Sequence, residues 1–435
     1  MGIFDNAIVG INNKIVKSIK TLNNGIIYER PSPSFIMEWT GNISTYDRLT
    51  CTGKCIVDWG DGSYSTLSGS FKLNHQYTDG LSSHIVILFG EVTSLENACF
   101  YNCTGLTSII LPGSITRLGD SCFNKCTGLT SIILPDSITS LGGSCFYKCT
   151  GLTSVTIPDN ITSLKGSCFA YTGLTSITIP NSITSIESYC FNGCTGLTSI
   201  VIPNSVTSLG EWCFRDCTGL TSITLSNSLT SFGRYCFHNC TSLTSVTLPN
   251  SLTSLVNNCF NGCTGLTSVT LPNNLTSLEG SCFYECTSLT SITLPNSLTN
   301  LGMNCFAYTG LTSITIPNSI TSIGDYCFMN CTDLTSVTLP DSVTSLGEWC
   351  FRGCTGLTSI ALPDSVTSIG EECFRGCTGL IDYELYWETS DSIITYDSNK
   401  MPTGSNTVFT IPYGLTNAYI DASYPSDKLI ERDVI

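Results

Sequence analysis

Charged residues are scarce in this sequence, and those present have the wrong sign for several classes of partner. Only 12% of the 435 residues are charged, and 33 acidic against 18 basic side chains leave a formal net charge of −15. A chain this acidic lacks the basic stripe of a nucleic-acid groove and would not dock electrostatically on anionic lipid. We therefore expect no nucleic-acid partner.

Long apolar runs and histidines are equally scarce. No stretch reaches the ~18 apolar residues that span a bilayer, so no direct membrane insertion is expected. The opening MGIFDN has neither the basic start nor the apolar stretch of a signal peptide. Only three histidines are available for acid–base or metal chemistry. Phosphate-loop, His-Glu-x-x-His and Gly-x-Ser-x-Gly motifs are missing, which predicts a non-enzymatic protein without a cofactor.

What the sequence does have is an internal repeat. The pair Cys-Phe recurs thirteen times, with its cysteine at positions 99, 122, 145, 168, 190, 213, 236, 259, 282, 305, 327, 350 and 373. Successive pairs are 23 residues apart, except for two steps of 22 that each follow a copy reading Cys-Phe-Ala-Tyr. Such regularity is typical of a solenoid, in which each unit stacks on its neighbours.

One unit, counted from Leu220 as position 1 to Ser242 as position 23, shows how each coil should fold. Apolar residues at positions 4 and 6 alternate as in a strand with one buried face. Positions 10 and 13 form a second short extended piece. The proline that usually ends the first strand lacks an N–H donor and stops the ladder. Positions 15 to 21 hold Cys-Phe-x-x-Cys, whose apolar spacing of three and four predicts a short helical turn.

The pattern Leu-Thr-Ser-Ile-Thr-Leu-Pro-Asn-Ser-Leu-Thr-Ser-Leu-Gly, followed by Cys-Phe-x-x-Cys-Thr, resembles the BspA-type leucine-rich repeats of microbial surface proteins. The resemblance covers about residues 84–380. Those repeats usually carry Ala-Phe where this chain carries Cys-Phe. The resemblance implies an α/β repeat fold, a leucine-rich-repeat solenoid of about thirteen 23-residue units with short parallel strands and short helical turns.

The two ends differ in composition from the repeat. Trp59-Gly-Asp-Gly-Ser63 and His75-Gln-Tyr77 resemble the signature of PKD-type β-sandwich domains, and Asn23-Asn-Gly25 is a hairpin signal. The expected units are an attachment hairpin at 1–34, a PKD-like β-rich domain and N-terminal cap at 35–90, the solenoid at 91–380 and a C-terminal cap at 381–435.

Of the 26 cysteines, 24 lie in the Cys-Phe-x-x-Cys motif. Because free cysteine is among the most buried residue types, a stacked column of small apolar side chains is one interpretation. Disulfides between neighbouring coils and a thiol-rich metal site are the alternatives, which the sequence leaves open. Cys51 and Cys55 flank a tight turn and could bridge across a hairpin. The column includes Cys122, Cys126, Cys145, Cys149, Cys190, Cys194, Cys213, Cys217, Cys236 and Cys240.

The copies differ mainly at unit positions 14–16 and 19–20. These positions hold Tyr189, Trp212, Tyr235, Tyr326, Trp349, Arg215, Arg352 and Arg375. Trp, Tyr and Arg are enriched at interaction hot spots, although drift on a solvent-facing turn would produce the same variation. If the array binds a partner, we expect these eight residues to contact it. Rows of Thr and Ser at positions 2, 3 and 5 are either a solvated strand surface or a ladder for glycan or ice.

Together these features predict a non-enzymatic surface-display or adhesion protein. It would bind a protein or glycan ligand on a host or neighbouring cell through many shallow contacts along its array. The resemblance implies adhesion and a location at the cell surface or outside the cell. Because no signal peptide is visible, a virion or tail-fibre component is the second candidate, and a thiol-rich metal-binding protein is the third.

Overall fold

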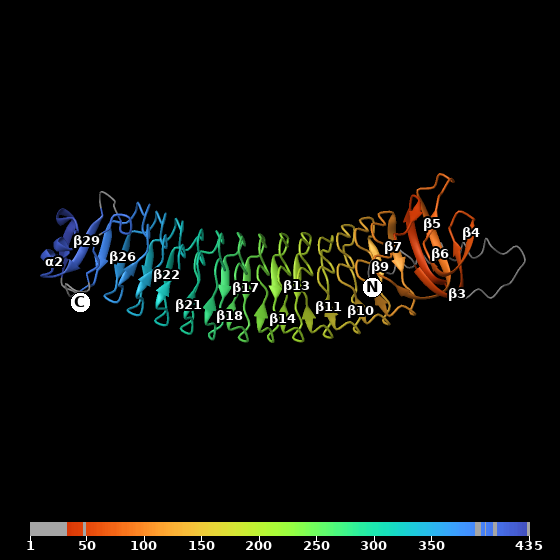
Figure 1. Cartoon of the computed structure of the whole chain (residues 1–435), viewed down its shortest axis with the longest axis horizontal. Helices are drawn as coiled ribbons and strands as arrows, with labels where there is room; N and C mark the ends of the chain where they lie inside the picture. The colour runs from red at the N-terminus through yellow and green to blue at the C-terminus, as the bar shows by residue number, and fades with distance from the viewer. Residues whose placement is uncertain (1–32, 47–48, 388–392, 396, 403–406, 433–435) are drawn as a thin grey trace, which may run out of the picture.

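The computed structural model describes residues 33–46, 49–387, 393–395, 397–402 and 407–432, so nearly all of the expected attachment hairpin lies outside the described residues. The chain forms an elongated array of coils (Figure 1). A β-rich unit lies at its N-terminal end, and α2 lies at the other end with β29.

Each coil contributes to two ladders of short strands. The ladder at unit positions 3 to 5 contains β7 (Leu106–Ile110), β9 (Ser131–Ile133), β13 (Ser199–Val201), β15 (Ser222–Thr224), β17 (Ser245–Thr247), β19 (Ser268–Thr270), β22 (Ser313–Thr315), β24 (Ser336–Thr338) and β26 (Ser359–Leu362). The ladder at positions 12 and 13 contains β8 (Arg117–Leu118), β10 (Ser140–Leu141), β11 (Ser163–Leu164), β12 (Ser185–Ile186), β14 (Ser208–Leu209), β16 (Ser231–Phe232), β18 (Ser254–Leu255), β20 (Ser277–Leu278), β21 (Asn300–Leu301), β23 (Ser322–Ile323), β25 (Ser345–Leu346) and β27 (Ser368–Ile369). Pairing is parallel and in register with the repeat, as where Ser199 faces Ser222. The predicted solenoid with parallel strands is therefore confirmed.

The segment predicted to be a short helical turn is not helical, so that prediction is wrong. In all thirteen coils the residue before the first cysteine has a positive φ, and so does the residue four positions later, as at Ser121 (57°) and Lys125 (62°). A left-handed residue at every fourth position interrupts a right-handed helix. Alternate N–H groups instead donate to the next coil, as Phe123 does to the Cys145 carbonyl at 2.8 Å. The described residues contain one short α-helix, α2 (Thr416–Asp421), and one 3₁₀ turn, η1 (Ser426–Lys428).

The N-terminal unit closes the open end of the solenoid. It consists of β1 (Pro33–Thr40), β2 (Ile43–Ser44), β3 (Leu49–Asp58), β4 (Tyr64–Phe71), β5 (Asn74–His75) and β6 (Ser83–Leu95). β1 pairs antiparallel with β6 on one side and with β7 on the other. The end of β6 pairs with β8 through Leu95 and Leu118. Both ladders of the first coil are thus paired, which leaves neither edge open to a second chain.

At the other end the position-3 ladder continues beyond the last repeat. β28 (Asp382–Leu385), β29 (Val408–Pro412) and β30 (Leu429–Arg432) add to β26 as parallel strands. Tyr383 packs edge-on against the last repeat phenylalanine, Phe374, with ring centroids 5.3 Å apart. The aromatic core therefore runs into this cap.

The core is a column of phenylalanines, one from each coil. Neighbouring rings from Phe100 to Phe374 are nearly parallel, with centroids 5.2–5.7 Å apart. Cys213 and Cys236 lie on successive coils, because the N–H of Phe214 donates to the Cys236 carbonyl at 2.8 Å. Because all thirteen rings are buried, the column makes the array stiff and fixes the position of every turn on its outside.

Candidate interaction surface

The variable residues at unit position 16 form an aromatic row on the outside of the array. Tyr189, Trp212 and Tyr235 all have φ between 57° and 62°. Their backbones are fixed by the next coil, since the N–H of Trp212 donates to the Arg234 carbonyl at 3.0 Å. The left-handed backbone and the ladder together give every position-16 side chain the same place, so rings on successive coils meet.

Trp212 lies at the centre of the first aromatic cluster. Its ring stacks on Tyr235 with centroids 4.0 Å apart and planes 4° apart, and Tyr189 stacks on its other side at 6.0 Å and 10°. The Arg215 guanidinium lies 4.5 Å from the Trp212 ring centroid, a cation–π contact. His238 packs obliquely against both Trp212 and Tyr235. We call Tyr189, Trp212, Tyr235 and Arg215 the central stack.

Two charges set the electrostatics of the central stack. Arg215 also pairs with Asp216, with Nε 3.2 Å from Oδ2. Burial, and then the nearby Arg215, lower the pKa of His238. The lowered pKa favours the neutral imidazole, and Arg215 is the cation that lies on the tryptophan face.

A second aromatic cluster lies at the same unit positions, farther along the array. Tyr326 and Trp349 have ring centroids 5.6 Å apart at an angle of 32°. The guanidinium of Arg352 covers Trp349 at 3.6 Å. Glu372 pairs with Arg352 at 3.9 Å and also with Arg375. The structure thus divides the eight predicted residues into two groups of four, each built on one tryptophan.

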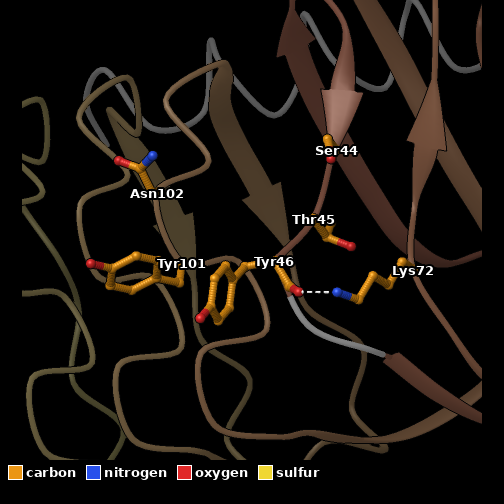
Figure 2. Close-up of a pocket in the computed structure, with 6 residues that line it drawn as sticks. All are labelled: Ser44, Thr45, Tyr46, Lys72, Tyr101 and Asn102. Carbon is orange, nitrogen blue, oxygen red and sulfur yellow. Dashed lines mark hydrogen bonds between the residues drawn. The ribbon is translucent and has the colours of Figure 1, made fainter.

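A third group, which the sequence analysis did not identify, lies where the N-terminal unit meets the first coil. Figure 2 shows Tyr46 beside Tyr101, with Lys72 donating to the backbone carbonyl of Tyr46. The ring centroids of the two tyrosines are 5.1 Å apart. A shallow cavity of about 640 Å³ lies here, lined also by Ser44, Thr45 and Asn102. Tyr101 occupies unit position 19 and was detectable as a variable position, whereas Tyr46 and Lys72 gave no sequence signal.

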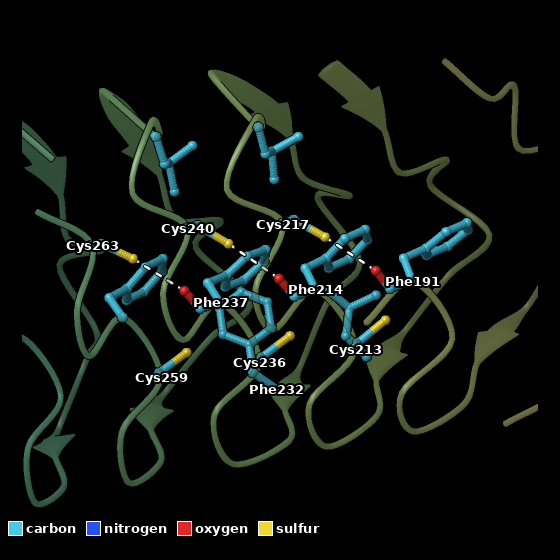
Figure 3. Packing of buried hydrophobic residues seen from close by; sticks show 14 of the residues in the cluster. Phe191, Cys213, Phe214, Cys217, Phe232, Cys236, Phe237, Cys240, Cys259 and Cys263 are labelled. Atoms are coloured by element: carbon cyan, nitrogen blue, oxygen red, sulfur yellow. Dashed lines mark hydrogen bonds between the residues drawn. The ribbon is translucent and has the colours of Figure 1, made fainter. Parts of the chain in front are cut away.

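The motif cysteines lie inside the array and not on this surface. All 24 are free and buried. Figure 3 shows Cys217, Cys240 and Cys263 each aimed at a phenylalanine carbonyl of the preceding coil, as Cys217 is at Phe191 with Sγ 3.1 Å from the oxygen. Burial raises the pKa of the Cys217 thiol well above its usual value, and that of Cys149 to about 12. Such protonated thiols are poor nucleophiles and poor metal ligands.

Cys51 and Cys55 form a disulfide. Nowhere in the described ranges do three or more His, Cys, Asp or Glu side chains come together as they would around a metal ion. No helix of the described part is long and apolar enough to cross a membrane.

The hydroxyl rows have a structural use. Thr130 at unit position 2 donates both its N–H and its hydroxyl to the Thr107 carbonyl, one coil earlier, at 2.9 and 3.1 Å. Thr139 at position 11 likewise donates its N–H and its hydroxyl to the Thr116 carbonyl, at 2.8 and 3.1 Å. These hydroxyls therefore already donate hydrogen bonds within the array, so they have no free donor for a ligand.

Comparison with known proteins places this geometry among leucine-rich repeats. A family model described as BspA type leucine rich repeat region (6 copies) matches residues 76–198, 184–310 and 299–418. A leucine-rich repeat protein from Bacteroides ovatus is 25% identical, with 70% of this chain and 94% of that chain covered and a TM-score of 0.43. A leucine rich cell surface protein from Faecalibacterium prausnitzii is 28% identical, with 64% and 89% covered and a TM-score of 0.44. A search of curated protein sequences gives no match.

Proposed function

Since the chain belongs to the BspA-type leucine-rich repeat family, we propose that it is a non-enzymatic binding scaffold displayed at a cell surface. In this role it adheres to a protein partner on a host or neighbouring cell through the turns at unit positions 16 to 20. These turns follow one another along the outside of the array, and we call them the turn edge. Its division into an attachment segment (1–34), a PKD-like N-terminal cap (35–90), a solenoid (91–380) and a C-terminal cap (381–435) is part of the proposal.

The observation that carries the proposal is the central stack. Trp212 is held between Tyr189 and Tyr235 while Arg215 lies over it. Trp, Tyr and Arg are the residues that dominate protein–protein binding energy when they are clustered and held in place. The ladders and the phenylalanine column already order their backbones, so little conformational entropy remains to be lost on binding.

The stacking geometry favours a protein over a sugar at this site. The face of Trp212 toward Tyr235 is covered, because the two rings lie 4.0 Å apart and parallel. The other side of Trp212 carries Tyr189 and the Arg215 guanidinium, so Trp212 presents mainly its edge to solvent. Ring edges carry partial positive charge and suit backbone carbonyls and the edges of other aromatic side chains, whereas a sugar needs an open ring face.

The two aromatic clusters allow one partner to be held at two points. Trp212 lies in the sixth coil and Trp349 in the twelfth. At about 4.8 Å per coil they are roughly 30 Å apart along the array. A partner or cell surface that contacts both clusters gains avidity, because the second contact forms at high effective concentration.

Adherence of protein-coated beads tests the proposal. Beads coated with the full chain are applied to epithelial monolayers and to a panel of microbial cells. The test variant carries Tyr189→Ser, Trp212→Ser and Tyr235→Ser together. Serine is native at this unit position in other coils, with the same backbone, as at Ser144 (φ 55°), so the fold should be kept.

We expect the triple variant to lose adherence by about thirtyfold, the effect of one hot spot of ~2 kcal/mol. The matched control is Tyr413→Ser, because Tyr413 is 74% exposed and follows β29 in the C-terminal cap, outside both aromatic clusters. Wild-type adherence by the triple variant, or an equal loss in the control, would contradict the proposal.

A further inference from the structure

We propose that the N-terminal end of the turn edge is a separate site for an acidic polysaccharide. The site is a strip of alternating cationic and aromatic side chains, which we call the basic-aromatic strip. It consists of Tyr46, Lys72, Tyr101, Lys125, Lys148 and Tyr171. None of these residues belongs to the central stack, so this site is additional to the proposed protein-binding surface.

The strip is continuous from the N-terminal unit into the solenoid. Lys72 lies 5.9 Å from the ring centroid of Tyr46, which contacts the Tyr101 ring. The Nζ of Lys125, one coil on, donates to the Tyr101 hydroxyl at 3.0 Å. Lys148 follows on the third coil, at the same unit position as Lys125.

The far end of the strip is on the fourth coil. Lys148 lies 5.4 Å from the ring centroid of Tyr147 and 5.7 Å from that of Tyr171. Each lysine therefore has an aromatic neighbour, and each tyrosine of the strip has a cation beside it. The six residues thus run from the N-terminal unit to the fourth coil, and the second and third coils are joined here by the backbone N–H of Lys125, which donates to the Tyr147 carbonyl at 2.7 Å.

The charge of the strip differs from that of the whole chain. The chain carries a net charge of −15, yet unit positions 19 and 20 of the first five coils contain no carboxylate. The first acid at these positions is Asp216, in the sixth coil. Within the described ranges Lys72, Lys125 and Lys148 form no ion pair, and their contacts are with a carbonyl, a hydroxyl and rings. These three cations are thus available to an anionic ligand.

The tyrosines of the strip are not stacked face to face on one another, unlike the rings of the central stack. Tyr46 and Tyr101 are tilted by 56°, and Tyr171 meets Tyr147 edge-on at 78°. Tyr46 is 60% exposed and Tyr171 is 39% exposed. Open aromatic faces are what the C–H face of a sugar ring packs against. An acidic peptide would use the lysines but would have little need of these faces.

The dimensions of the strip also suit a polysaccharide. Lysines at one unit position recur at the coil spacing, about 4.8 Å, which is close to the length of one pyranose unit. The shallow cavity of about 640 Å³ between Tyr46, Lys72 and Tyr101 gives room for one sugar residue at the start of the chain. A linear polysaccharide with an anionic group on its repeating sugars would therefore meet cations and ring faces in turn.

Binding of the full chain to immobilised glycans tests this inference by biolayer interferometry. The probes are heparin, which carries sulfate, and polygalacturonate, which carries only carboxylate. Neutral dextran and polyglutamate serve as comparison surfaces. One variant is Lys125→Asn with Lys148→Asn, and another is Tyr46→Ser with Tyr171→Asn. Asparagine is native at unit position 20 in other coils, as at Asn239 (φ 58°).

We expect binding to at least one acidic glycan, weakened about tenfold by either variant pair and by added salt. The control pair Lys54→Asn with Lys165→Asn removes two exposed cations outside the strip and should leave binding unchanged. The inference would be overturned if the chain bound no acidic glycan, or if the control pair lost binding as strongly as the strip variants. It would also be overturned if the chain bound polyglutamate equally tightly and the tyrosine variant kept that binding. The central-stack triple variant should still bind glycan, so the two sites can fail independently.

Discussion

The thiol of Cys240 donates a hydrogen bond to the backbone carbonyl of Phe214, 3.2 Å away and one coil earlier. Ten of the eleven second-position cysteines make this contact. In the two coils that lack this cysteine, Thr172 and Thr309 place a hydroxyl beside the thiol of the next coil. The cysteines are therefore polar links between coils as well as apolar filler.

Replacing one of these links should destabilise the array measurably. Cys240→Ala removes a buried sulfur and its hydrogen bond, which together cost about 1–2 kcal/mol. Urea unfolding followed by circular dichroism measures the change. Ser222→Ala, on the exposed face of β15, is the matched control and should change stability by less than about 0.5 kcal/mol. Equal midpoints for Cys240→Ala and wild type would show that the sulfur contact is not stabilising.

The motif thiols should be unreactive in the native protein. They are buried, and burial raises the pKa of Cys194 to about 11 even though Thr172 contacts its sulfur. A thiol-specific reagent at neutral pH should modify none of the 24 free cysteines before denaturation and all 24 after it. Prior reduction should raise the denatured total to 26, through the Cys51–Cys55 disulfide. Rapid native modification of several thiols would contradict the buried column.

Stability should fall at alkaline pH. Burial raises the pKa of Cys213 well above its usual 9.0, while in the unfolded chain this thiol ionises near 9. Below that pH both states keep the proton and the thiol makes no difference. Above it only the unfolded state releases protons, so the free energy of unfolding falls by about 1.4 kcal/mol per buried thiol per pH unit.

Unfolding midpoints between about pH 7.5 and pH 10.5 measure this loss. Cys213→Ala with Cys236→Ala should make the decline shallower, because two of the titrating groups are gone. A midpoint that does not change over this range, or a decline equally steep in the double variant, would contradict the assignment to the thiols.

The left-handed residue before the first cysteine gives a backbone prediction. Ser144 has a φ of 55°, where a β-branched side chain is strained and glycine is not. Ser144→Val should lower stability by about 1–2 kcal/mol, and Ser144→Gly should leave it equal or slightly higher. Ser199→Val, at an exposed position in the strand β13, should be neutral. Thermal melts that rank valine above glycine at residue 144 would refute the turn geometry.

Much of the fold was predictable because the repeat fixes its own register. The thirteen Cys-Phe pairs and the alternation at unit positions 4 and 6 predicted a solenoid of stacked strands. The resemblance to BspA-type repeats, which implied that these strands are parallel, is confirmed by the family match. The resemblance of residues 35–90 to PKD-type domains stays a prediction. The helical turn was wrong because a spacing of three and four also fits paired turns. Ser121 and Trp212 at unit position 16 adopt positive φ although neither residue type favours it, whereas unit position 20 often carries a type that does, as at Asn239 and Gly353.

The candidate surface was predictable only in part. Unit position 16 stood out because it varies and carries aromatic residues, and the structure stacks Trp212 between two of them. Tyr46 and Lys72 were not predictable, since they reach Tyr101 only through the pairing of the N-terminal unit with the first coil. Contacts between segments so far apart in the sequence leave no local pattern.

The central claim is that the turn edge, rather than either strand ladder, contacts the partner. Hydroxyl-radical footprinting of the full chain, free and bound to the cells it adheres to, tests this most directly. We predict protection of Tyr189, Trp212 and Tyr235, with Tyr413 and the exposed Val201 of β13 labelled as strongly as in the free protein. Protection of Val201 while the three aromatic residues stay fully labelled would place the contact on the strand face and contradict the account.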